Sequence, residues 1–206
     1  MQSDGRPIGL KRNPIIEEAR RRQIIDAAIE TVAAVGYAQA SLSRIAQHAR
    51  ISKSVISYHF AGKDDLLEQV VTQIYDDSWK FIEAALETED TASGKLRAYI
   101  RSNLDYLHAH RSRALAVGDI VRGHRAPDGT PRFAATTDES VVDLLTAILR
   151  QGLADGEFRD LDPQVVAVTV GQALIGVLGL WVMNPAVDLA ACTTELITLF
   201  DRATRK

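Results

Sequence analysis

The sequence is poor in cysteine, aromatic side chains and proline. Cys192 is the single cysteine among 206 residues, so no disulfide can form within one chain, which fits a reducing compartment such as the cytoplasm. Aromatic residues make up 6% of the chain, and proline occurs six times. With 46% hydrophobic and 25% charged residues, the composition is that of an ordinary globular protein, and it excludes collagen and low-complexity chains.

No segment has the pattern of a secretory signal or of a membrane span. Residues 1–13 are polar and basic and have no apolar centre. The longest stretch with little charge, residues 161–183, is interrupted by Asp162 and holds three glycines, so we interpret it as a buried helix. A cytoplasmic protein without a membrane partner is therefore expected.

The sequence also lacks the common catalytic and metal-binding motifs. It has no Gly-x-Ser-x-Gly elbow, Walker loop, dinucleotide-binding glycine signature or zinc-protease motif. His108 and His110 would face different ways on a helix, and we interpret both of them and His124 as surface histidines. No metal and no cofactor are expected, and the protein is predicted not to be an enzyme. The alternative is a helical enzyme whose site is assembled from distant residues.

Charge is divided unevenly along the chain. Residues 1–63 carry ten basic and five acidic side chains, a net charge of +5, whereas residues 64–206 carry 14 basic and 22 acidic side chains, a net charge of −8. A basic segment on an acidic body is typical of a protein that binds a polyanion such as nucleic acid. Because charge asymmetry is common, the charge alone does not establish nucleic-acid binding, and sequence motifs are needed as further evidence.

Helical periodicity extends over nearly the whole chain. Ile24, Ala28 and Val32 recur at four-residue spacing on a helix that begins at Asn13-Pro14 and ends near Gly36. The other expected helices cover residues 42–48, 53–59, 63–86, 93–107, 112–122, 137–153, 163–183 and 188–202. Ser93 is the expected cap of the helix over residues 93–107. No alternating strand pattern and no internal repeat is evident, so the predicted fold class is all-α.

The two shortest expected helices have the size of a helix-turn-helix unit. Residues 42–48 and 53–59 are joined by a three-residue turn, and their inward positions, such as Ile45, Ala46 and Ile56, are apolar. The outward positions around the second helix are polar and can donate hydrogen bonds to phosphates or base edges. They are Ser52, Lys53, Ser54, Ser57 and Tyr58. The alternative is a tight helical hairpin with a polar outer face.

The same residues resemble the TetR family of tetracycline-repressor-like regulators. The resemblance covers about residues 17–70 and rests on the motifs SLSRIAQHA (41–49), ISKS (51–54), YHF (58–60) and GKDDLL (62–67). It implies an N-terminal three-helix helix-turn-helix domain and a larger C-terminal helical domain for ligand binding and dimerisation. The expected divisions are a flexible basic arm (1–13), a DNA-binding domain (14–63) and a ligand-binding and dimerisation domain (64–206), with the helix from residue 63 linking the two domains.

The resemblance implies DNA contacts residue by residue. Ser41 matches the cap that touches phosphate, and Lys53 matches a position at the start of the recognition helix. Tyr58 and His59 match a Tyr-His-Phe variant in which both side chains meet the DNA backbone or base edges, and Lys63 matches a lysine close to phosphate. The predicted DNA-binding set is Ser41, Arg44, Arg50, Ser52, Lys53, Ser54, Ser57, Tyr58, His59 and Lys63.

Two positions depart from the family pattern. Arg50 stands where the family usually has glycine, and a left-handed residue there would cost on the order of 1–2 kcal/mol. We hypothesise that Arg50 recovers part of this cost by reaching a phosphate. Ser57 stands where many members have a tyrosine, so one typical phosphate contact is missing and the base preference is open.

Two further basic segments have alternative interpretations. The arm of residues 1–13, with Arg6, Lys11 and Arg12, is either a loose solvated tail or a segment that enters an A·T-rich minor groove. Residues 20–22 are three consecutive arginines that would face several directions on the first helix. They form either a solvated face or a contact to the DNA backbone.

The resemblance also implies a ligand cavity among the middle helices and a dimer interface on the last long helices. A mostly apolar cavity with few polar groups would suit a hydrophobic or aromatic ligand. Its candidate residues are Phe81, Tyr99, Asn103, Leu104, Leu107, His108, Gln172 and Trp181. The candidate dimer residues are Val141, Leu144, Leu145, Ile148, Gly171, Gly176 and Gly179, which otherwise would pack within one monomer.

Together these patterns predict a homodimeric, ligand-responsive transcriptional regulator. Two recognition helices would enter successive major grooves of a pseudo-palindromic operator. The TetR resemblance implies a repressor, which a small, largely hydrophobic molecule would release from DNA. A helix-turn-helix regulator without a small effector is the alternative.

Overall fold

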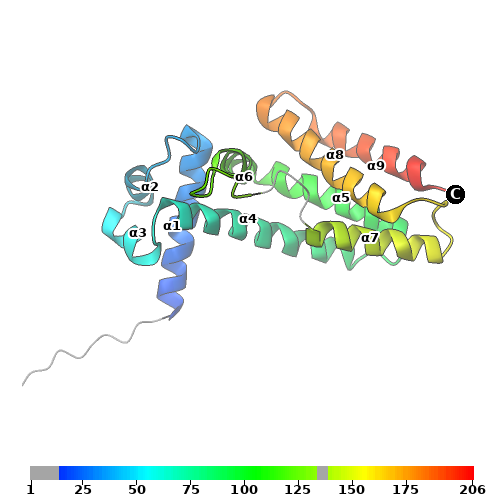
Figure 1. Cartoon of the computed structure of the whole chain (residues 1–206), viewed down its shortest axis with the longest axis horizontal. Coiled ribbons are helices and arrows are strands. Elements are labelled where there is room, and N and C mark those ends of the chain that lie inside the picture. Colours follow the sequence, from blue (N-terminus) through cyan, green and yellow to red (C-terminus); the bar gives the residue numbers. More distant parts are fainter. Residues whose placement is uncertain (1–13, 134–138) are drawn as a thin grey trace, which may run out of the picture.

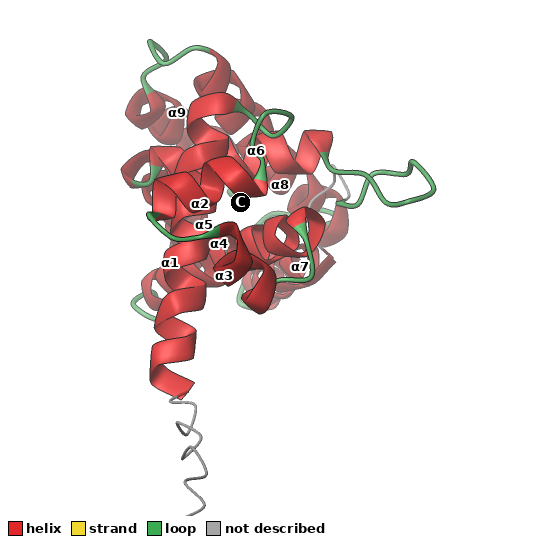
Figure 2. Ribbon diagram, turned by 90° about the vertical axis from the view of Figure 1, so that its left-hand side faces the viewer, coloured by secondary structure: helices red, strands yellow, loops and turns green. Residues whose placement is uncertain are grey.

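The computed structural model describes residues 14–133 and 139–206, and within these ranges the regular structure is helical (Figures 1 and 2). The helices are α1 (Pro14–Val35), α2 (Leu42–Ala49), α3 (Lys53–His59), α4 (Lys63–Leu86), α5 (Ala92–Ala109), α6 (Arg111–Gly123), α7 (Glu139–Ala154), α8 (Pro163–Met183) and α9 (Leu189–Thr204). Isolated β-bridges join Arg125 to Pro131 and Phe158 to Arg205, and the described ranges contain no longer strand. The predicted all-α fold is confirmed.

The helices are arranged as a small end and a longer bundle. Helices α1, α2 and α3 form the small end, and α4 runs from there into a bundle with α5, α7, α8 and α9 (Figure 1). Helix α6 packs on both α1 and α4, between the two parts. The predicted cap Asn13, the basic arm of residues 1–13 and the expected start of a helix at residue 137 lie outside the described residues.

Side chains fix several helix starts by accepting hydrogen bonds from backbone N–H groups that have no partner within the helix. Ser41 does so for α2, Asp162 for α8 and Asp188 for α9. Helix α5 differs from the prediction, because its cap is Thr91 and not Ser93. The helix begins one residue after Thr91, which places Ser93 already inside its first turn.

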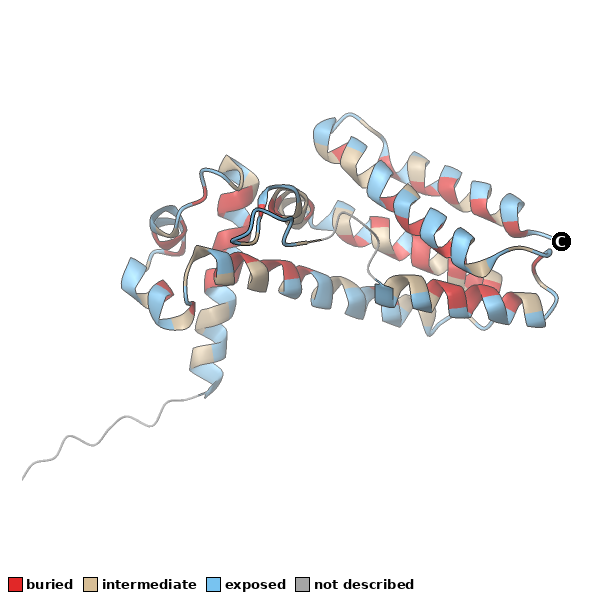
Figure 3. Cartoon of the chain, viewed as in Figure 1, coloured by how far each residue is buried: buried red, intermediate tan, exposed pale blue. Residues whose placement is uncertain are grey.

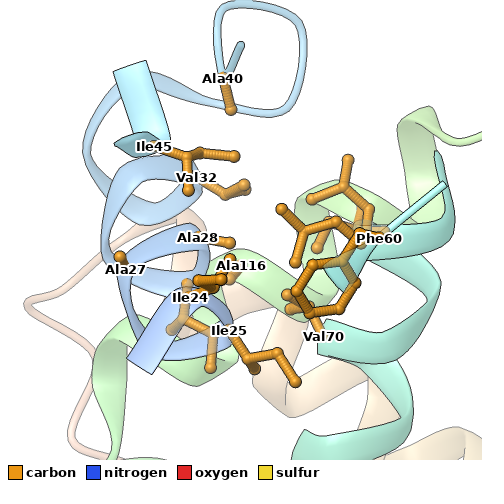
Figure 4. Packing of buried hydrophobic residues seen from close by; sticks show 14 of the residues in the cluster. Ile24, Ile25, Ala27, Ala28, Val32, Ala40, Ile45, Phe60, Val70 and Ala116 are labelled. Carbon is orange, nitrogen blue, oxygen red and sulfur yellow. The ribbon is translucent and has the colours of Figure 1, made fainter. Parts of the chain in front are cut away.

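Buried apolar side chains form two clusters, and the first crosses the predicted domain boundary. Ile24, Ala28 and Val32 of α1 lie at its centre and are at most 1% exposed (Figure 4). Side chains from the first half of α4 join them, as do Ala116 and Ile120 of α6. The core of the small end is therefore completed by helices that follow residue 63.

The second cluster fills the bundle. Leu104 of α5 and Leu145 and Leu149 of α7 are fully buried in it, together with side chains of α8 and α9. This cluster gives the bundle a core of its own, at the far end of α4 from the helix-turn-helix unit.

Helix α8 differs from the prediction of a buried helix, because only one of its faces is covered (Figure 3). By length and composition alone, α8 is long and apolar enough to cross a membrane, with a mean hydropathy of 2.1 over an 18-residue window. Only 28% of that window is buried within the protein. The exposed apolar side chains of α8 are Val165, Val168, Ile175, Leu180 and Met183. Their helical spacing makes them one stripe.

Candidate nucleic-acid interface and ligand pocket

The turn between α2 and α3 contains a left-handed arginine. Arg50 has φ 55° and ψ 43°, and its N–H donates to the carbonyl of Gln47 at 3.2 Å. The N–H of Ile51 donates to the carbonyl of Ala46 at 3.0 Å, which closes the C-terminus of α2. The backbone conformation anticipated for position 50 is therefore present with a non-glycine residue.

Helix α3 presents most of its side chains to solvent. Ile56 is its fully buried residue, whereas Lys53, Ser57 and Tyr58 are exposed. Ser52 stands at the cap position but makes no capping hydrogen bond, and its hydroxyl pairs with that of the exposed Ser54 at 2.8 Å. The predicted outward positions therefore share one polar, accessible surface, as a recognition helix requires.

The flanking candidates have different surroundings. Ser41 and Arg44 are exposed at the start of α2, where the Arg44 guanidinium donates to the backbone and side chain of Gln39 at 3.3 and 3.2 Å. His59 is half-buried, and its ring meets the ring of Tyr58 edge to face, with centroids 4.9 Å apart. The hydroxyl of Tyr58 also lies 3.4 Å from a carboxylate oxygen of Glu17, on α1.

Lys63 is half-buried and contacts Tyr37. Its ammonium group donates to the carbonyl of Tyr37 at 2.8 Å and lies 4.6 Å from the centre of the tyrosine ring. Burial lowers the pKa of Lys63, while the carboxylate of Asp64 acts in the opposite direction. This lysine thus fastens the segment between α1 and α2 to the start of α4, and its contact to phosphate stays a prediction.

Tyr37 also joins the helix-turn-helix unit to α6. Its backbone N–H donates to the carboxylate of Asp119, and its hydroxyl lies 3.1 Å from Nδ1 of His124. A Cβ atom on Gly123 would stand 2.6 Å from the tyrosine ring, so only glycine allows this close approach. Local sequence patterns do not predict this contact, because its partners are more than 80 residues apart.

The interpretation of His124 as a surface histidine is wrong. The residue is 1% exposed at the end of α6, with Nε2 3.6 Å from Glu68 and Nδ1 3.8 Å from Asp64, both on α4. The Glu68 carboxylate also accepts two hydrogen bonds from Arg132, at 2.7 and 3.0 Å, and these lower its pKa. Within the described ranges, no group of three or more histidine, cysteine, aspartate or glutamate side chains has a geometry for a metal ion.

Asp77 on α4 joins three helices by ion pairs. It accepts from Arg113 of α6 at 2.7 Å and from Arg22 of α1 at 3.3 Å. Gln73, one turn earlier on α4, donates to it at 2.9 Å. Burial by itself would raise the pKa of Asp77, but the two arginines outweigh it and hold that pKa below its usual value.

A pocket of about 280 Å³ opens in the bundle between α4, α5, α6, α7 and α8. Aromatic side chains of α4 and α5 line it, namely Tyr75, Trp79 and Tyr99. The aliphatic lining is Ile74, Ile82, Leu107, Val117, Val141, Leu174, Ile175 and Leu178, and the polar lining is Ser78, Asn103 and Ser140, with Gly171 from α8. None of these side chains is charged.

The polar end of the pocket contains a tyrosine–asparagine pair. Burial raises the pKa of Tyr99 to about 12, and a hydrogen bond with the side chain of Asn103 acts in the opposite direction. The phenol therefore stays protonated at any physiological pH and acts as a neutral hydrogen-bonding group.

Two family profiles match the chain. Residues 24–70 match the profile described as bacterial regulatory proteins of the tetR family, and residues 89–181 match the profile described as a tetracyclin repressor-like C-terminal domain. The chain belongs to the TetR family. The resemblance that the motifs of residues 41–67 indicated is thereby confirmed, and the family assignment extends into the bundle.

Curated relatives match this TetR-family chain over different lengths. The HTH-type transcriptional regulator BetI 1 of Chromohalobacter salexigens is 38% identical over 90 residues, which are 44% of this chain and 43% of that protein. The chain thus spans less than half the length of that relative. The fatty acid metabolism regulator protein of Bacillus subtilis is 24% identical over 194 residues, 86% of this chain and 91% of that protein.

Solved structures share the fold. The fatty acid degradation regulator FadR of Bacillus halodurans superposes with a TM-score of 0.72 at 23% identity, covering 92% of this chain and 96% of that one. FadR of Bacillus subtilis in complex with stearoyl-CoA gives a TM-score of 0.66 at 24% identity, covering 86% and 96%. At these identities the likeness concerns the TetR-family fold alone.

The pocket of this family member contains part of the predicted set. Tyr99, Asn103 and Leu107 line it, whereas Leu104 is fully buried in the core beside it. Phe81, His108 and Gln172 are exposed elsewhere, and Trp181 is buried under His108 and Arg111. Tyr75 and Trp79 also line the pocket but were not among the predicted residues, although their four-residue spacing on α4 places them on one face of the helix.

The predicted dimer residues divide into two groups. Leu145, Ile148 and Gly171 are buried inside the single chain, so they differ from the prediction, while Val141 and Leu144 are half-buried and Val141 also lines the pocket. Gly176 and Gly179 lie on the exposed stripe of α8, where an added Cβ would meet no atom within 4 Å. These two glycines leave a surface that a second backbone can approach closely.

Proposed function

We propose that this protein is a homodimeric, ligand-responsive transcriptional regulator that represses genes by binding a pseudo-palindromic operator in the cytoplasm. The observation that carries this proposal is the exposed polar face of α3, held on a helix-turn-helix unit whose inner face is buried. A helix of this length and polarity fits the major groove of DNA. The named relatives are transcriptional regulators, which supports a binding protein over an enzyme.

The stripe on α8 supports a dimer. A free monomer would expose Val165, Val168, Ile175, Leu180 and Met183 to water along one face. Pairing two such faces would bury them, and it would hold two α3 helices at a fixed distance, as two half-sites one helical turn apart require. Leu199 on α9 is another exposed apolar side chain, at 54%.

The pocket supports a compact, uncharged and mostly apolar effector. Its volume lies at the low end of the range for ligand sites, and its lining combines aromatic walls with a few neutral hydrogen-bonding groups. Tyr99 and Asn103 would orient a polar group of the ligand. A long acyl chain, as in the stearoyl-CoA bound to the Bacillus subtilis structure, would require the pocket to widen, so acyl-CoA compounds are useful probes.

Helix α6 provides a route from the pocket to DNA. Val117 lines the pocket, and Asp119 on the same helix and His124 directly after its end bond Tyr37, which lies between α1 and α2. A ligand that fits only one position of α6 would shift the population away from the arrangement that binds DNA.

Fluorescence anisotropy over a salt series tests the proposal. The protein is titrated with DNA from upstream of its own gene, with a random-sequence duplex pool, and with unrelated DNA. Tight binding to one sequence that weakens steeply with salt is the expected result. Equal, weak binding to all duplexes, with no sequence enriched from the pool, would contradict a sequence-specific regulator.

A ligand screen separates this proposal from a regulator without a small effector. Compounds that raise the melting temperature are tested for release of the bound DNA, with saturated and aromatic acids, their CoA esters and neutral aromatics as the first set. Release by at least one compound class is expected, and substitution of Asn103 by leucine should weaken it. Partner proteins would become the next candidates if no compound bound the pocket.

A further inference from the structure

The recognition helix is attached to the rest of the small end by few contacts. Of its residues Lys53–His59, Ile56 is the fully buried one. On the side facing the first turns of α1, a cleft of about 320 Å³ separates α3 from α1, and its lining includes Ile16, Val55 and Tyr58. Phe60, directly after α3, is buried in the core, but the cleft leaves the α1 side of the turn that holds Tyr58 and His59 without close packing.

An arginine of α1 holds this turn in place. The guanidinium of Arg21 donates from Nη1 to the carbonyl of His59 at 2.6 Å, and its Cζ lies 4.6 Å from the centre of the Phe60 ring. The last carbonyls of a helix lack partners within the helix and carry partial negative charge, so a cation there satisfies both needs. Arg21 is half-buried, which strengthens the interaction relative to one in open water.

The C-terminus of α2 is held in a similar way from the same helix. Gln23 donates from Nε2 to the carbonyl of Ala49 at 3.1 Å, next to the left-handed Arg50. Arg20 donates to the side-chain oxygen of Gln23 at 2.7 Å and so orients its amide. Arg21 and Gln23, two residues apart on α1, thus bond the C-terminal ends of both helices of the helix-turn-helix unit.

We propose that Arg21 is a positioning residue that sets the place of the C-terminal turn of α3, and through it the place of Tyr58 and His59, without itself touching DNA. The inference rests on the proposed DNA-binding function. Neither interpretation of the arginine run 20–22, a solvated face or a contact to the DNA backbone, fits Arg21, because its guanidinium contacts His59 and Phe60 within the protein.

A phosphate contact and a positioning role for Arg21 predict different salt dependences of DNA affinity. A side chain that neutralises a phosphate releases a counterion, so its removal reduces the slope of log affinity against log salt by about one and weakens all sequences alike. A positioning residue leaves the number of phosphate contacts unchanged. Its removal weakens the specific sequence more than an unrelated one and leaves the slope as it was.

The experiment uses the full chain and the duplex that the wild-type protein selects from a random-sequence pool. Arg21→Met removes the donor and the charge but keeps a long side chain over Phe60, while Arg21→Lys keeps a charged donor of similar length. Arg22→Met is the matched control, since it removes the same charge one residue away, where Asp77 keeps its partner Arg113. Hydrogen exchange of the free proteins is measured alongside.

The expected result is a loss of about tenfold in affinity for the selected duplex in Arg21→Met, with affinity for unrelated DNA and the salt slope unchanged. Arg21→Lys should recover part of the loss, and Arg22→Met should stay within about twofold of wild type. In the free protein, amides of residues 57–60 should exchange about tenfold faster in Arg21→Met, while those of α4 and α5 keep their rates.

Other results would overturn the proposal. Equal loss on both duplexes with a reduced salt slope would make Arg21 a phosphate contact, and unchanged affinity with unchanged exchange would make the contact dispensable. If Arg21→Met does not fold, Arg21→Lys decides by the same measurements. A wild-type protein that selects no duplex would refute the proposed function. The exchange rates of residues 57–60 would then test the Arg21 contact separately, because faster exchange in Arg21→Met would support it and unchanged exchange would not.

Discussion

Arg50 combines a strained backbone with an exposed cationic side chain at the turn between α2 and α3. Its φ of 55° is the one positive value among the described non-glycine residues. A left-handed residue with a Cβ costs about 1–2 kcal/mol, and glycine avoids this cost. The protein therefore accepts a local penalty where a glycine would serve the turn, and a DNA contact by the guanidinium would account for it.

Replacing Arg50 by glycine should raise the free energy of unfolding by about 1 kcal/mol, because the strain is removed. The same change at the exposed, helical Gln47 should lower it by about 1 kcal/mol. Urea denaturation followed by circular dichroism measures both. The glycine variant should also bind the selected DNA more weakly. Unchanged affinity would contradict a phosphate contact by Arg50.

Lys53 and Tyr58 are exposed on α3, and we propose that they contact bases or phosphates of the operator. Lys53→Ala and Tyr58→Ala should each weaken binding to the selected duplex by about tenfold, while the helical signal and the sedimentation of the protein stay unchanged. Lys80→Ala, which removes an exposed charge on α4, should leave affinity as it was. Wild-type affinity in both α3 variants would place the DNA interface elsewhere.

At the scale of elements, α1, α4 and α6 are held together by polar contacts as well as by packing. Asp77 accepts from arginines of α1 and α6. Tyr37, after the end of α1, donates its N–H to Asp119 of α6, and its hydroxyl pairs with His124 at the end of that helix. Each of these links joins residues far apart in sequence. Movement of any one of the three helices must strain or break at least one of these links, and we therefore propose that a ligand signal passes through this junction.

Asp77→Asn should lower the free energy of unfolding at pH 7 by about 1–3 kcal/mol, since Arg113 loses its charged partner. The native pKa of Asp77 lies below its usual value, so its contribution is present at neutral pH and is lost as the pH falls through that lowered pKa. The difference between wild type and variant should therefore shrink below about pH 4.

Denaturation curves between pH 7 and pH 3 measure this difference. Asp76→Asn on the exposed side of α4 is the control and should change stability by less than about 0.5 kcal/mol at every pH. A difference for Asp77→Asn that stays constant across the range would show that the carboxylate charge is not what the junction uses.

The helices could be predicted from the sequence, but the contacts between them could not. Pro163–Met183 and Lys53–His59 follow from local signals, namely a cap with a proline and a run between two turn segments. The burial of His124 and the position of Tyr37 depend on side chains more than 80 residues away. Periodicity finds the inner face of a helix, but it does not tell which inner residues face a cavity, so Leu104 and Tyr99 could not be distinguished.

At the scale of the whole molecule, the uncovered face of α8 sets the expected assembly. Gly176 lies in the middle of the apolar stripe with open space above it. Gly176→Glu would place a charge at the centre of the proposed interface, where burying it without a partner costs several kcal/mol. The variant should sediment as a monomer at micromolar concentration while wild type sediments as a dimer, and its DNA affinity should fall.

The matched control is Ala84→Glu, which adds the same side chain at an exposed position of α4. It should leave the dimer intact. Sedimentation of Gly176→Glu as a dimer would move the interface to another surface.

The place of α6 in the first core has a consequence for synthesis. Ala116 and Ile120 pack against α1, so the small end lacks part of its interior until residue 120 has left the ribosome. A nascent chain that has emerged only as far as α3 has the helix-turn-helix sequence but no closed core beneath it. The growing polypeptide therefore acquires a firm DNA-reading surface only after more than half of the protein, including the helix that touches the pocket, has been made.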